Sequence, residues 1–73
     1  MSEFHHWNYR VTKKKVIGEW VYEIREVHYD EGEVTAWTAD AINPWGLTKG
    51  KLRRDLEHML EALDRPTLNL DKL

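Results

Sequence analysis

Apolar and polar residues alternate with a period of two along three stretches in the first half of the chain. In "HWNYRVTKK", Trp7, Tyr9 and Val11 alternate with polar residues, which is typical of a strand with one buried face. "EWVYEIREVHY" and "EVTAWTA" follow, after loops that contain Gly18 and Gly32. Glycine-containing loops between such stretches indicate hairpins. The pattern predicts a three-stranded antiparallel meander over about residues 6–40.

The middle stretch changes parity along its length. Trp20, Tyr22 and Ile24 share one parity, and Val27 and Tyr29 fall on the other. A β-bulge near residues 25–26 would re-aim them; without one, the strand is apolar on both faces and its second face needs cover. If that face is uncovered, Val27 and Tyr29 lie exposed beside Trp37, and we take these three residues as a candidate interface. An exposed apolar patch of this kind favours a homodimer.

The second half changes to a helical period. "DAINPWG" breaks the strand pattern, so residues 41–47 form a loop and a helix spans about residues 48–64, with Thr48 as its N-cap and Pro66 beyond its end. The tail, residues 65–73, forms a short edge strand or a loose end. A single stripe at helical spacing is expected to face the sheet: Leu52, Leu56, Met59, Leu60 and Leu63. The fold class is therefore α+β, a single domain over residues 1–73 with the helix packed on one sheet face.

Length and composition exclude several kinds of functional site. A chain of 73 residues is long enough to form one hydrophobic core. The absence of cysteine excludes disulfides and thiolate metal sites. The start "MSEFHHWNYR" lacks the apolar segment of a signal peptide, and no apolar run reaches the roughly 20 residues that span a bilayer. We therefore expect a cytoplasmic protein that does not enter a membrane. The serine at position 2, Ser2, is the only one in the sequence, which leaves no good nucleophile for acyl transfer.

Acid–base and metal chemistry have few candidates. His28 shares a side of its strand with Glu26 and lies close to Asp30, but nothing in the pattern predicts a pocket deep enough to perturb them. The adjacent His5 and His6 point apart in an extended chain, and a further histidine lies on the helix. We expect no catalytic residue, no metal site and no cofactor.

Charge is distributed unevenly although the net charge is −2. A helix prefers acidic residues in its first turn and basic residues in its last, but this helix has the reverse order. Its basic start is a candidate site for an anion or a partner, and consists of Lys49, Lys51, Arg53 and Arg54. The alternative is that these residues pair with the acidic hairpin at residues 30–33.

Segments of the hairpin and of the helix resemble those of known protein families. "YEIREVHYDEG" and "LRRDLEHMLEALDRP" resemble a group of short bacterial proteins that share an "EVYYDE" hairpin and a final "LxxMLEALDKP" helix; this likeness implies no function. The order of sheet and helix is also similar to HicB-like antitoxin domains, which implies toxin neutralisation. "HYDEGEV" departs from the "PGC"-type turn of those domains.

Two classes of function follow. The first is a small non-catalytic protein-interaction module, either a regulator or an antitoxin-like binding protein, that binds a second copy or another protein. The second is a nucleic-acid binder that uses Arg10, the lysines at 13–15 and the basic helix start, with aromatic rings stacking on bases. The negative net charge favours the first, because most of the surface would repel phosphate.

Overall fold

A computed structural model of the chain describes residues 5–73, so Ser2 lies outside the described residues. In chain order the described elements are β1 (His6–Val16), β2 (Glu19–Asp30), β3 (Glu33–Trp37), α1 (Lys49–Ala62), β4 (Leu68–Asn69) and the 3-10 turn η1 (Leu70–Lys72). The sheet order is β3-β2-β1-β4, and β4 pairs with β1 in parallel. The α+β class and the antiparallel order of the first three strands are confirmed, and the tail contributes a short parallel strand.

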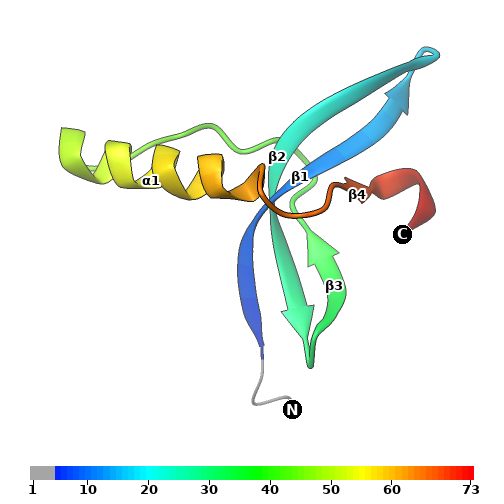
Figure 1. The fold of residues 1–73 in the computed structure, drawn as a ribbon, viewed down its shortest axis with the longest axis horizontal. Coiled ribbons are helices and arrows are strands. Elements are labelled where there is room, and N and C mark those ends of the chain that lie inside the picture. The colour runs from blue at the N-terminus through cyan, green and yellow to red at the C-terminus, as the bar shows by residue number, and fades with distance from the viewer. Residues whose placement is uncertain (1–4) are drawn as a thin grey trace.

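β1 and β2 form the longest element pair of the molecule. They pair antiparallel without interruption from His6 opposite Tyr29 to Val16 opposite Glu19. Ile17 and Gly18 close this hairpin with φ angles of 48° and 79°, and a left-handed conformation is one that glycine adopts without steric cost. Because β3 and β4 pair with other parts of the two strands, residues 14–22 project as a two-stranded arm (Figure 1).

The irregularity in β2 lies nearer the end of the strand than the sequence predicts. β1 pairs with β2 straight through residues 25–26, and the register shift occurs between His28 and Tyr29, where β2 pairs with β3. Of the two alternatives, the bulge at residues 25–26 is therefore wrong. The apolar residues of β2 therefore lie on both faces of the strand, and both faces must be covered.

α1 and the sheet enclose a small core on one face. Its buried members are Tyr9, Val11, Met59 and Ala62, and the partly buried Ile24 and Ile42 pack against them. The helix begins as predicted, because Thr48 is extended at φ −136° and its Oγ1 accepts a hydrogen bond from the Lys51 N–H at 3.1 Å. This bond satisfies one of the free amides of the first turn.

Hydrogen bonds attach the loop before α1 to β2. The Thr38 N–H donates to the Glu26 carbonyl at 3.1 Å, and the Ile42 N–H donates to the Ile24 carbonyl at 2.9 Å. Further along, Gly46 lies against the first turn of α1: a Cβ there would come within 2.7 Å of the Lys51 carbonyl carbon and would also meet the Leu52 nitrogen. Residue 46 must therefore lack a side chain if the loop is to pass this close.

The second sheet face is covered by side chains of the sheet itself and by the loop. Arg25 is 2% exposed. Its Nη1 donates to Thr12 Oγ1 at 2.7 Å, its Nε donates to the Thr38 carbonyl at 3.2 Å, and its Nη2 lies 3.2 Å from a Glu23 carboxylate oxygen. A buried guanidinium is tolerated when its donors find such partners.

β4 and η1 lie along β1 on the side opposite β2. Thr12 and Lys13 pair with Leu68 and Asn69, and the Lys15 N–H donates to Asp71 Oδ2 at 2.9 Å. With α1 on one side and the arm on another, the described residues spread into separate lobes (Figure 1). Their radius of gyration is 13.3 Å, compared with about 11 Å for a compact domain of this length.

Candidate interaction surface

The face of α1 that packs on the sheet includes Met59, Ala62 and Asp55. Met59 is 8% exposed and Ala62 is fully buried. On the same side, Asp55 accepts a hydrogen bond from the Tyr9 hydroxyl at 2.6 Å and another from the Trp45 N–H at 3.0 Å. The carboxylate joins the helix to β1 and to the preceding loop. Together these contacts fix the rotation of α1 about its own axis.

Most of the leucines that were expected in the core face solvent. Leu56 is 47% exposed, Leu60 is 65% exposed and Leu63 is 63% exposed, while Leu52 is half-buried. The predicted orientation of the helix is therefore wrong, although Met59 does lie in the core. The physical reason is that small Ala62 lets the helix backbone approach the sheet, while the bond between Tyr9 and Asp55 holds that side inward.

These leucines form a continuous apolar surface, the leucine stripe, defined as Leu52, Leu56, Leu60 and Leu63. Residues three or four apart lie on the same side of a helix, so the four side chains follow one another along α1 and its C-cap. A hollow of about 240 Å³ opens on this side, lined by Leu52 and Leu56 together with Lys49 and Arg53.

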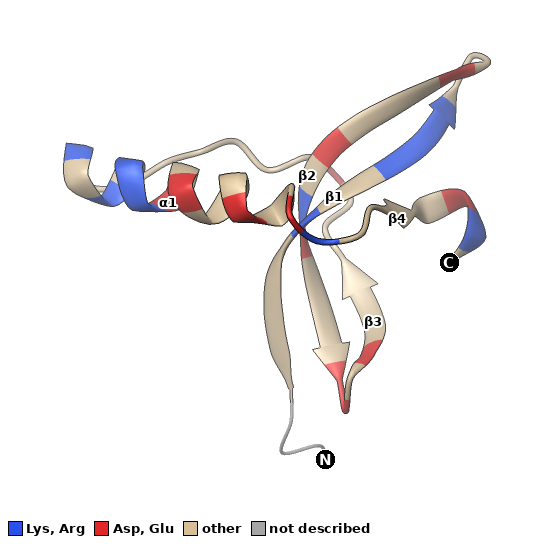
Figure 2. Ribbon diagram, in the orientation of Figure 1, with Lys and Arg blue, Asp and Glu red and all other residues tan. Residues whose placement is uncertain are grey.

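A row of charges borders the leucine stripe. Lys49, Arg53, Glu57 and Asp64 are spaced by four, four and seven residues, which places them on one flank of the helix and of the turn after it. All four are exposed. The row is basic at the start of α1 and acidic at the end, as Figure 2 shows along the whole helix. We call these residues the charged row.

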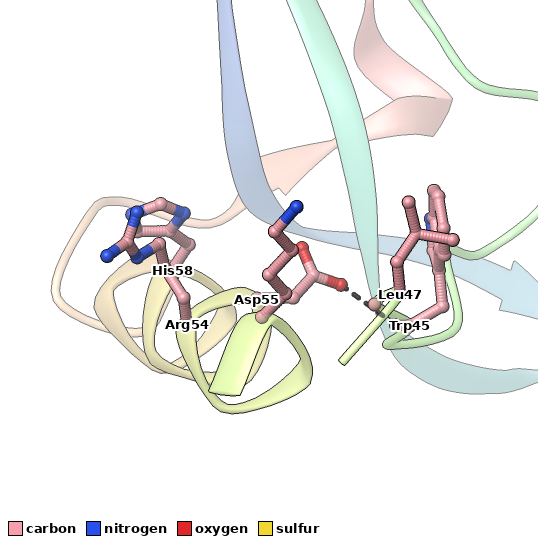
Figure 3. A pocket seen from close by; sticks show the side chains of 7 residues that line it. Trp45, Leu47, Arg54, Asp55 and His58 are labelled. Atoms are coloured by element: carbon pink, nitrogen blue, oxygen red, sulfur yellow. Dashed lines mark hydrogen bonds between the residues drawn. The ribbon is translucent and has the colours of Figure 1, made fainter. Parts of the chain in front are cut away.

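The four basic residues predicted as one site are divided between two flanks. Lys49 and Arg53 line the hollow beside the leucine stripe. Lys51 and Arg54 line a different hollow, of about 260 Å³, together with Trp45 and other residues (Figure 3). Each residue is exposed, but the four do not converge on one point.

The basic helix start also does not meet the acidic hairpin. Among residues 5–73, the ion pairs are those of Arg25 with Glu23 and of His28 with Glu26, and the start of α1 and the turn between β2 and β3 lie in different lobes (Figure 2). The alternative in which the helix start pairs with residues 30–33 is therefore wrong for this fold, because the loop before α1 carries the helix away from that turn.

The candidate interface at the second sheet face is not exposed in this chain. Val27 is fully buried, Tyr29 is 7% exposed and Trp37, which pairs with Val27 in the β2–β3 register, is half-buried. The Arg10 Nη1 donates to the Tyr29 hydroxyl at 2.7 Å, and that hydroxyl donates to Asn8 Oδ1 at 2.9 Å. The expectation of an uncovered face is wrong, because neighbouring side chains close it. A charge placed at Tyr29 would test the fold rather than an interface.

The hollow beside Trp45 contains Asp55 (Figure 3), whose two carboxylate oxygens accept the hydrogen bonds described above. Burial, and then the hydrogen bond to Asp55, raise the pKa of Tyr9 from 10.0 to about 12. A hydroxyl that holds its proton so firmly is a poor general acid at neutral pH. The arrangement joins α1 to β1 and to the preceding loop.

His28 contacts the partner that the sequence suggested. Its Nε2 lies 3.3 Å from Glu26 Oε1, and its Nδ1 lies 3.4 Å from His5 Nε2. Both members of the His28–Glu26 pair are about a third exposed. Among residues 5–73, no group of three or more histidine, cysteine or acidic residues converges as metal ligands would.

The arm is a second exposed apolar region, which alternation did not reveal. Trp20 is 40% exposed, Tyr22 is 60% exposed and Ile17 is 99% exposed. The Nζ atoms of Lys13 and Lys15 lie 4.5 and 4.7 Å from the centroid of the Trp20 ring. Alternation places Trp20 and Tyr22 on the face that α1 covers, but it does not show that the helix ends before reaching them.

Comparison with known proteins adds no family to these observations. No helix among the described residues has both the length and the apolar character needed to cross a membrane. No family model, no curated protein and no solved structure matches the chain.

Proposed function

We propose that this protein is a non-catalytic protein-interaction module that binds protein through the leucine stripe of α1. The observation that supports the proposal most strongly is the division of apolar residues. Six hydrophobic residues of the described chain are buried, whereas eleven large ones are exposed. Surface leucines are ordinary when scattered, but a continuous set on one helix face is typical of an interface.

The shape of the molecule supports the same proposal. An extended chain of this length, with a radius of gyration of 13.3 Å, has a small core relative to its surface. Small domains without disulfides or metals commonly gain the missing stability by association. A helix with one face on the sheet and a second apolar face in solvent is a natural place for that association. An antitoxin-like role, implied by the resemblance to HicB-like domains, would be one form of such binding.

Nucleic-acid binding has less support. The basic residues are divided among the start of α1, the first hairpin, the centre of the sheet and the C-terminal segment (Figure 2). In the first hairpin, Lys13 and Lys15 stack on Trp20, and Arg10 donates to the Tyr29 hydroxyl and to the Pro66 carbonyl. A strand of nucleic acid would find no continuous basic track that combines free cations with free rings.

Site-specific photocross-linking in the cells that produce the protein tests the proposal. A photoreactive phenylalanine at Leu60, which is 65% exposed within the leucine stripe, is expected to form a covalent protein adduct. The matched control carries the same group at Arg54, which is exposed on the other flank of α1. Adducts from position 60 and none from position 54 support the function. No adduct from position 60 would overturn it.

A further inference from the structure

The geometry points to a second copy of this chain as the occupant of the leucine stripe: we infer that two α1 helices pair antiparallel about a two-fold axis near the middle of the stripe. This inference rests on the proposed function and names the partner of the same surface. It is carried by the order of charges beside the stripe and by the spacing of the leucines within it.

The leucine stripe is nearly symmetric about its centre. Its members follow at intervals of four, four and three residues, so reversing the direction of the helix gives almost the same pattern. A two-fold interface uses the same patch on both chains. Two antiparallel helices can pack through such a patch when the spacing of its side chains is the same in both chain directions. Rows of side chains spaced by four also form the ridges that pack into the grooves of another helix.

The charged row selects the antiparallel direction. In an antiparallel pair, one flank of each helix faces the same flank of the other, with the start of one helix beside the end of its partner. Lys49 and Arg53 of one copy would then both lie near Asp64 of the other, while the two copies of Glu57 would lie close to the axis. In a parallel pair, the two basic helix starts would lie side by side, and so would the two acidic ends, and like charges placed together disfavour association.

The reversed charge order of α1 also finds a reason in this pairing. Basic residues near the start and acidic residues near the end oppose the dipole of their own helix. In the antiparallel pair, the basic start of each helix lies near Asp64 and the carbonyl end of the neighbouring helix, which carry the opposite charge. Binding to a protein of a different sequence would not require the charges of α1 to be complementary to those of a second α1. The self-complementary charges of the row therefore favour a second copy.

A matched pair of charge reversals tests the inference. K49E/R53E changes the charged row, whereas K51E/R54E changes the net charge by the same amount on the other flank. Sedimentation velocity of the full chain is expected to show a dimer for the parent protein and for K51E/R54E. K49E/R53E is expected to weaken association by roughly tenfold or more, because four ion pairs become repulsive.

Mixing complementary variants removes any ambiguity about folding. E57K/D64K is expected to associate as weakly as K49E/R53E, and an equimolar mixture of the two is expected to regain dimers, since acidic starts then meet basic ends. A mixture that stays monomeric, or a K49E/R53E variant that dimerises like the parent, would overturn the inference. A parent protein that is monomeric at millimolar concentration would also overturn it. If Leu60 then cross-links to a different protein in cells, the proposed function stands without self-pairing.

Discussion

At the scale of single residues, Asp55 joins three parts of the fold. It accepts from the Tyr9 hydroxyl and from the Trp45 N–H, so one carboxylate links β1, the loop and α1. Hydrogen bonds to a charged acceptor are stronger than those between neutral groups. Tyr9 is 9% exposed, so its hydroxyl would lack a replacement partner if this bond were lost. This contact explains why the more polar side of α1 faces the sheet.

The raised pKa of Tyr9 predicts a loss of stability in alkaline solution. The folded protein holds the proton up to about pH 12, whereas the unfolded chain releases it near pH 10.0. The contribution of this group is therefore complete below pH 10 and is lost as the pH rises toward 12. Urea unfolding at a series of alkaline pH values measures the effect.

Tyr9→Phe provides the control for that prediction. The variant has no proton to lose at position 9, so its free energy of unfolding should fall less steeply between pH 10 and pH 12 than that of the parent. Parallel curves for the two proteins would show that Tyr9 ionises as readily in the fold as outside it.

At the scale of elements, the sequence predicted where most helices and strands begin and end, but it did not predict which face of α1 packs on the sheet. The helix was expected over residues 48–64 and spans Lys49–Ala62 with Thr48 as its N-cap, because caps and prolines are local signals. The inner face was not predictable by hydrophobicity, since leucine is more apolar than Ala62. Close approach and the bond to Asp55 decide it, and both depend on residues distant in sequence. The parallel pairing of β4 with β1 is likewise non-local.

Two substitutions one residue apart distinguish the faces of α1. Met59→Ala is expected to lower the free energy of unfolding by about 2–5 kcal/mol, as truncation of a buried side chain does. Leu60→Ala is expected to change it by no more than about 0.5 kcal/mol, as surface substitutions do. Chemical denaturation in protein dilute enough to keep the chains separate measures both. Equal losses for the two variants would place both faces in the core.

At the scale of the whole molecule, the described residues leave much of their apolar surface in solvent. Eleven large hydrophobic side chains are exposed, and they concentrate on the outer face of α1 and on the arm. The two surfaces lie in different lobes (Figure 1), so one partner on α1 leaves the arm open. Folding and association are then linked, because whatever binds the native state also stabilises it.

Thermal unfolding should therefore depend on protein concentration. For a self-associating chain, a tenfold increase in concentration is expected to raise the midpoint by roughly a few degrees. Leu56→Glu, which puts a charge in the leucine stripe, should remove the dependence while leaving the midpoint of the dilute protein nearly unchanged. Scanning calorimetry at two concentrations measures this. A parent midpoint that does not change with concentration would contradict the linkage.

The short ladder between β1 and β4 has a consequence for solubility. β1 is 11 residues long, and on the side opposite β2 it pairs with Leu68 and Asn69, while Asp71 holds the Lys15 N–H. An uncovered strand of that length would offer a row of free backbone groups on which other chains could add strands. The segment from Leu68 to Asp71 lies outside the core cluster, yet it occupies part of this edge. We expect that proteolytic loss of that segment would make the chain more prone to form intermolecular β-sheet.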